Sequence, residues 1–143
     1  TNATASTSTS TGALIVDGGV GVAGAVYASS FSVNGIYDQI SSTLVTSNTN
    51  ANQVALTINA SSFRTAKMVV QVTSGSNYHS QEILMVHDDS QVYMTEYAQV
   101  LGAGNSILSS FDAQVNMFGI VELLVTPINA STVYTCSCTA MRA

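Results

Sequence analysis

Hydrophobic and polar residues alternate with a period of two along most of the chain after residue 53. The clearest stretch is 66–73, in which Ala66, Met68, Val70 and Val72 alternate with Lys67, Val69, Gln71 and Thr73. A period of two predicts a strand with one buried face. Comparable stretches occur at 54–58, 82–87, 92–97, 107–115, 120–125 and 133–140. Turn signals such as Ser74-Gly75-Ser76-Asn77 separate them, so the pattern predicts seven strands.

Closely spaced strands without a long helical period are typical of an antiparallel sandwich or barrel. We therefore predict an all-β fold in which residues 53–143 form an antiparallel, jelly-roll-like β-sandwich. Within its first strand, the alternation places Val54, Leu56 and Ile58 on one face. Pro127 is expected to end the sixth strand, because proline cannot donate a ladder hydrogen bond.

The first third of the chain follows a different pattern. Residues 13–37 mix small apolar residues with glycine, and Asp17-Gly18-Gly19 and Asn34-Gly35 are strong turn signals. This pattern predicts a neck of short strands and tight turns, whose side chains are too small to build a core alone. The Ser/Thr-rich residues 1–12 are expected to be an extended or mobile linker, and residues 38–52 a polar connection.

The low number of charged residues limits the possible functions of the chain. Of the 143 residues, 46% are hydrophobic, a normal share, but only 8% are charged, against roughly 25% in an ordinary soluble domain. Three basic residues cannot neutralise a phosphate track, which excludes nucleic-acid binding by a basic surface. The apolar stretch 12–28 is short and contains Asp17 and several glycines, so we do not predict membrane insertion.

One glycine motif could suggest a cofactor. Gly19-x-Gly21-x-x-Gly24 matches the dinucleotide fingerprint, which requires a helix directly after the glycines. The sequence that follows, AVYASSFSV, is rich in β-branched and aromatic residues and favours a strand. We therefore predict no nucleotide site and no cofactor, and interpret the glycines as positions where backbones turn or approach closely.

The titratable residues gather in one part of the sequence, at His79, Glu82, His87, Asp88 and Asp89. A zinc site needs three or four ligands with supporting hydrogen bonds, so we favour Asp88 and Asp89 as turn formers and His87 as a strand-end residue. A Ser-His-Asp triad stays open in so serine-rich a chain, although no nucleophile-elbow sequence is present. We predict no catalytic and no metal residues. Convergence of both histidines with Asp88 and Glu96 in one cleft would reopen the enzyme hypothesis.

Two pairs of residues share a strand face. Cys136 and Cys138 lie two apart on one strand, a spacing unsuited to an intrachain disulfide, and we expect them to be small buried residues. Tyr93 and Tyr97 line another strand and form either a sugar-contacting surface or a half-buried one; we favour the second.

Residues 6–35, STSTSTGALIVDGGVGVAGAVYASSFSVNG, resemble a segment of large virion structural proteins of tailed phages, especially of T4-like marine phages. The matching positions are Gly12-Ala13-Leu14, Val16, Gly18-Gly19-Val20-Gly21-Val22, Gly24 and Tyr27. A looser similarity to a β domain of such proteins covers residues 63–67, 78–88, 95–97, 110–113 and 123–127.

This resemblance implies a non-enzymatic structural component of a phage virion, a fibre, spike or decoration protein on capsid, neck or tail. It implies a homotrimer that contacts other virion proteins. The alternative is an adhesin tip that binds a host receptor or surface glycan. In the trimer, residues 13–37 would intertwine as the neck, because three copies can bury what one cannot. The candidate oligomerisation residues are Val16, Val20, Val22, Val26 and Phe31.

Overall fold

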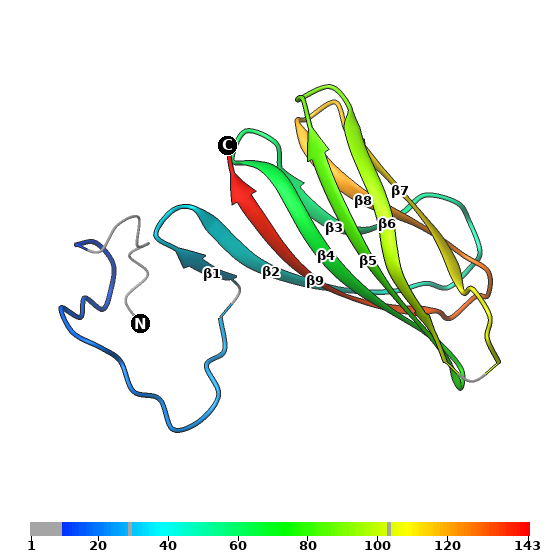
Figure 1. Ribbon diagram of the computed structural model, residues 1–143, viewed down its shortest axis with the longest axis horizontal. Helices are drawn as coiled ribbons and strands as arrows, with labels where there is room; N and C mark the ends of the chain where they lie inside the picture. Colours follow the sequence, from blue (N-terminus) through cyan, green and yellow to red (C-terminus); the bar gives the residue numbers. More distant parts are fainter. Residues whose placement is uncertain (1–9, 29, 103) are drawn as a thin grey trace.

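The computed structural model describes residues 10–28, 30–102 and 104–143, and these form an all-β structure (Figure 1). Its described strands are β1 (Ser30–Val33), β2 (Tyr37–Val45), β3 (Gln53–Asn59), β4 (Phe63–Ser74), β5 (Asn77–His87), β6 (Val92–Leu101), β7 (Ser109–Val115), β8 (Ile120–Pro127) and β9 (Val133–Arg142). The described part contains no helix, and so none that could cross a membrane.

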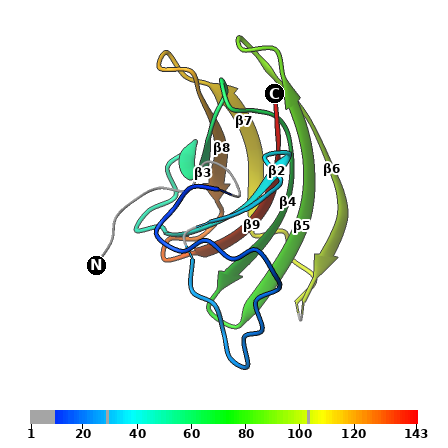
Figure 2. The same ribbon diagram turned by 90° about the vertical axis from the view of Figure 1, so that its left-hand side faces the viewer.

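The strands make two antiparallel sheets. The larger has the order β1-β2-β9-β4-β5-β6 and the smaller has the order β3-β8-β7. Figure 2 shows the larger sheet curving around the smaller one. The predicted antiparallel sandwich is confirmed, and its seven predicted strands correspond to β3 through β9. As in a jelly roll, early and late strands pair in both sheets, β2 with β9 and β3 with β8, whereas β4, β5 and β6 form a simple meander.

The core lies between the sheets and follows the alternation of the sequence. On β4, Ala66, Met68, Val70 and Val72 each expose 1% or less of their surface. They pack with the inward residues of β8 and β9, which are Val121, Leu123, Val125, Tyr134, Cys136, Cys138 and Ala140. Full burial of one aliphatic side chain stabilises the fold by about 1.5–3 kcal/mol, so this double layer supplies the main driving force.

A β-bulge corrects the prediction for β3. The pairing with β8 shifts between Val54 and Leu56, so one extra residue lies on β3. Ala55 and Leu56 are both buried, while Val54 is 42% exposed instead of sharing the face of Ile58. The carbonyl of Ala55 accepts a hydrogen bond from the Ser42 hydroxyl at 2.5 Å. The bulge therefore tilts the start of β3 toward β2 in the other sheet.

The predicted polar connection at 38–52 is wrong over its first half, because Tyr37–Val45 is the strand β2. It pairs along its whole length with β9, from Tyr37 opposite Met141 to Val45 opposite Val133. Ile40 and Leu44 pack against the core from this strand. Serine and threonine on both faces weaken the contrast between them, so the period of two is hard to see in the sequence. Only residues 46–52 form a connection.

The predicted β neck is also corrected. Residues 10–28 contain no strand, and only β1 and the Asn34-Gly35 turn form in the predicted manner. Both turn residues have positive φ, 52° and 64°, as a tight hairpin turn requires. Residues 13–28 pair with none of the described strands, and a strand without a partner is not stable. Ile36 and Tyr37, at the end of the predicted neck, bond to the end of β9. Most of the predicted linker, residues 1–9, lies outside the described residues.

Strand β6 is an open edge of the larger sheet, and Glu96 lies in its middle. Glu96 is paired with Ile83, whose side chain is fully buried, so the register directs Glu96 toward the inner face. Desolvation raises the pKa of its carboxyl group. An inward-pointing charge on an edge strand discourages another strand from pairing there, because pairing would desolvate it further.

We expect Glu96→Val to remove this protection. The variant should form thioflavin-binding β-aggregates at concentrations where the unmodified protein stays clear, because the edge then offers an apolar, unpaired strand. Glu96→Lys keeps a charge at the same position and should remain soluble. Equal solubility of the valine variant and the unmodified protein would contradict this role for Glu96.

Candidate functional site

The described segment that precedes the sandwich carries many exposed apolar side chains. Figure 1 shows it leading away from β1 as a wide loop. The candidate oligomerisation residues Val16, Val20, Val22, Val26 and Phe31 each expose between 45% and 67% of their surface. Leu14, Ile15, Tyr27, Val33 and Ile36 are exposed as well. So many exposed apolar side chains along one segment favour an interaction site over ordinary surface.

The glycines of this segment have room around them. A Cβ atom added to Gly18, Gly19, Gly21 or Gly24 would meet no other atom within 4 Å. Residues 25–28 after the Gly19-x-Gly21-x-x-Gly24 motif are irregular, so the motif does not open a helix. The open space at each glycine leaves access for a backbone from outside the chain.

The two histidines lie at opposite ends of β5. Eight residues of strand separate His79 from His87, which is about 26 Å. Glu96 is paired with Ile83 between them, and Asp88 lies in the turn beyond His87. These four residues therefore do not converge in one cleft. Among the described residues, no group of three His, Cys, Asp or Glu side chains could hold a metal ion.

His79 is part of the core. Its Nδ1 accepts a hydrogen bond from the backbone N–H of Leu108 at 3.4 Å, and its Nε2 contacts the Gln99 amide at 3.2 Å. The ring packs edge-on against Phe111 with centroids 5.9 Å apart. Burial lowers the pKa of His79, and a hydrogen bond with Gln81 opposes this in part. The side chain thus joins β5, β6 and the approach to β7.

His87 has an equally structural environment. Its Nε2 lies 2.5 Å from the carbonyl oxygen of Phe63, so this nitrogen carries the proton and donates it. Its Nδ1 accepts the backbone N–H of Asp89 at 3.2 Å. In the same turn, hydrogen bonds from the Ser90 side chain and from the backbone N–H groups of Ser90 and Gln91 hold the pKa of Asp88 well below its usual range. The turn-former interpretation of Asp88 is confirmed.

The cysteines behave as predicted. Cys136 and Cys138 are free thiols buried on the inner face of β9. Burial raises the pKa of both thiols, that of Cys138 to about 12. Protonated, buried thiols are poor nucleophiles and poor metal ligands, so these residues act as small core side chains.

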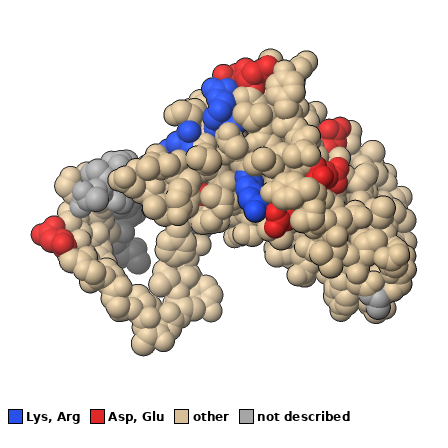
Figure 3. Space-filling view, in the orientation of Figure 1, with Lys and Arg blue, Asp and Glu red and all other residues tan. Residues whose placement is uncertain are grey.

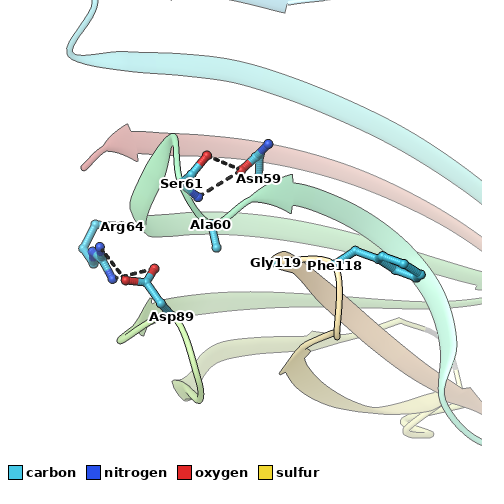
Figure 4. A pocket seen from close by; sticks show the side chains of 7 residues that line it. All are labelled: Asn59, Ala60, Ser61, Arg64, Asp89, Phe118 and Gly119. Carbon is cyan, nitrogen blue, oxygen red and sulfur yellow. Dashed lines mark hydrogen bonds and ion pairs between the residues drawn. The ribbon is translucent and has the colours of Figure 1, made fainter.

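A cavity at one end of the sandwich was not foreseen from the sequence. It has a volume of about 530 Å³ and is lined by Asn59, Ala60, Ser61, Arg64, Asp89, Phe118 and Gly119 (Figure 4). Arg64 forms an ion pair with Asp89 at 3.1 Å and donates to the carbonyl of His87. Phe118 lies on the opposite side with its ring directed away from this pair. The lining comes from the turns β3–β4, β5–β6 and β7–β8. No local sequence motif predicts that these three turns lie together.

Tyr93 and Tyr97 lie on the outer face of the larger sheet, 54% and 38% exposed. The Tyr93 hydroxyl donates to Asp88 at 3.1 Å, and this hydrogen bond raises the pKa of the tyrosine. The Lys67 ammonium group lies 5.9 Å from the centre of the Tyr97 ring and 3.0 Å from Glu82. Both tyrosines are thus partly buried, in agreement with the half-buried interpretation favoured from the sequence.

Comparison with known proteins gives a partial likeness to a solved structure. No protein-family model and no curated protein matches the sequence. Among solved structures, the chain is similar to the tailspike protein of Acinetobacter phage vB_ApiP_P1, with a TM-score of 0.46 and 13% sequence identity. The likeness covers 88% of this chain and 26% of the tailspike chain. The chain therefore spans about a quarter of the length of that protein.

The lowered pKa of His79 makes stability depend on pH. The unfolded chain binds a proton at His79 near the ordinary pKa of 6.5, whereas the folded chain resists it. Stability from this residue is therefore complete above pH 6.5 and is lost as the pH falls through the folded-state pKa. We expect the free energy of unfolding, measured in urea from pH 7 to 5, to fall by at most ~1.4 kcal/mol per pH unit.

The matched variant for this experiment is His79→Gln, which retains a polar group but cannot titrate. Its free energy of unfolding should change less steeply over the same pH range. An identical slope in both proteins would show that other groups cause the effect.

Proposed function

We propose that the protein is a non-enzymatic structural component of a tailed-phage virion, a fibre, spike or decoration protein on the capsid, neck or tail. In this proposal it forms a homotrimer through residues 13–37. The observation that carries the proposal is the exposed apolar surface of that segment, which includes Val16, Val20 and Val22. The resemblance of residues 6–35 to virion structural proteins supports the same conclusion from the sequence.

The physical properties of the segment suit chain-on-chain packing. Its only charged residue within 13–37 is Asp17, so three copies bring little like charge together. Its glycines have open space around them, which permits close backbone approach. Strand pairing with other copies would satisfy the backbone and bury the valines in one step. Closed symmetric assembly is the usual form for such identical contacts.

The environments of the chemically versatile side chains support a structural role. His79 and His87 are bonded to backbone groups of neighbouring strands, and the thiols of Cys136 and Cys138 are buried among apolar residues. Each of these groups has a defined task within the fold. The non-enzymatic part of the proposal rests on these contacts.

We expect light scattering of the full chain at micromolar concentration to give three times 14.8 kDa, about 44 kDa. Replacing Val20 and Val22 with aspartate should dissociate this species, because it would gather six carboxylates at the neck. Ile128→Asp, at an equally exposed position beyond β8, should leave it intact. A monomeric chain would refute the trimer, and purified phage particles that contain none of the protein would refute the virion assignment.

A second candidate function, a glycan-binding adhesin tip, is favoured by the cavity at the end of the sandwich. Arg64, Asp89 and Asn59 offer charged and amide groups around a volume of about 530 Å³, enough for a sugar ring. Side chains of this kind hydrogen-bond sugar hydroxyls. The surrounding turns are the part of the molecule in which a tip would vary.

This candidate is tested on a glycan array with two variants of equal chemistry. Asp89→Asn should weaken binding at least tenfold, because the carboxylate is removed from the cavity. Asp112→Asn, an exposed aspartate on β7, should bind as the unmodified chain does. Absence of binding to any glycan would refute the adhesin and leave the structural proposal standing.

A further inference from the structure

The outer face of the larger sheet carries an apolar row that crosses all of its strands. The strand register places opposite one another, from β1 to β6, the residues Val33, Tyr37, Met141, Thr65, Val86 and Tyr93. Of these, Val33, Met141, Val86 and Tyr93 expose between 43% and 54% of their surface. A row of this length on a solvent-facing sheet is far from the polar pattern that such a face normally shows.

The apolar surface extends beyond this row. Leu84 and Val69 lie beside it, each 41% exposed, and Tyr97 follows on β6. A shallow hollow of about 300 Å³ is set into the face, lined by Thr65, Leu84, Met85, Val86, Tyr93, Met94 and Thr95. This hollow is large enough to accept an apolar side chain from a facing surface.

The same face has almost no charge. Lys67 and Glu82 are its charged residues, and their ion pair at 3.0 Å makes their sum zero. The net charge of −5 therefore lies on the rest of the chain, although Asp88 borders the face through Tyr93. Figure 3 shows how sparsely charged side chains are set into the visible surface. In a closed trimer this face meets a different surface of the next copy, and a face without net charge can approach another neutral surface of this acidic protein without repulsion.

The size of the face matches that of a specific interface. Strands β2, β9, β4, β5 and β6 lie side by side, and β4 pairs with β5 from Thr65 to Ser74. With strands about 4.8 Å apart and about 3.4 Å per residue, the whole face spans roughly 700 Å², close to the ~800 Å² that each partner buries in a standard interface. This area includes outward Ser, Thr and Gln residues of β2, β9 and β4 as well as the apolar row.

We infer that the outer face of the six-stranded sheet is buried against a second copy of this chain. The inference rests on the proposed homo-oligomer for the presence of that copy, and it adds a second contact surface to the neck. A basic or acidic partner would find no charge to match on this face, whereas a copy offers neutral apolar surface. The hollow beside Val86 and Tyr93 lies at the corner of this face where β5 ends and β6 begins.

Cysteine labelling of the full chain tests this contact directly. The native cysteines are 1% and 0% exposed, so the unmodified chain gives a low background. In the oligomer, Val86→Cys should react with a maleimide at least tenfold more slowly than Met117→Cys, which lies in the exposed β7–β8 turn. After unfolding in urea the two rates should be equal. Leu84→Cys provides a second probe should the first variant fold poorly.

The outcomes separate this inference from the proposed function. Equal labelling of Val86→Cys and Met117→Cys in a protein that scatters as a trimer overturns the buried face and leaves the neck-driven trimer in place. A monomeric chain overturns both. Val86→Cys can also be labelled in a chain in which Val20 and Val22 are aspartate. If labelling with maleimide stays slow there, the sheet face holds copies together without the neck, which supports the inference.

Discussion

The insertion of the last strand, β9, between β2 and β4 is the interaction on which the larger sheet depends. It pairs with both neighbours along nearly its whole length. The C-terminal end of β9 is held by Arg142, whose guanidinium group forms an ion pair at 3.0 Å with Asp38, 104 positions earlier in the sequence. The inward residues of β9 also form the middle of the core. Without β9, the six-stranded sheet would divide into a hairpin and a meander that share no edge.

Charged side chains and exposed apolar surfaces lie on different parts of the molecule. Arg64, Asp88 and Asp89 gather at the turns on one end of the sandwich, where Arg64 and Asp89 line a cavity. The segment before β1 and the outer face of the larger sheet are nearly neutral and apolar. In the proposed assembly these two surfaces are the ones that contact other copies, and the charged end lies apart from them. The open edge of β6 could also pair with another strand, but the inward-facing charge of Glu96 discourages this.

The sequence predicts this fold best where burial on one side of a strand is complete. On β4 the inward residues Met68, Val70 and Val72 can be recognised from the alternation, because one face meets the core. The single apolar exception among the outward residues of this stretch is Val69. It fails on β2, where serine and threonine occupy both faces, and at Ala55, where a bulge changes the face without any local signal. The cavity could not be predicted, since Arg64 and Asp89 are 25 residues apart and meet only through the strand register. Of the strands predicted for the neck, the single chain forms β1 in the described residues.

Because the outer sheet face carries no net charge, a contact made through it depends little on the salt concentration. Dissolved ions screen attraction between charges within about 10 Å at 0.1 M salt, but they do not screen apolar contact. Excluded salts such as sulfate strengthen apolar burial. A contact made through Val86 and its neighbours therefore tolerates both dilute medium and concentrated brine, environments in which an assembly held by ion pairs would change its strength.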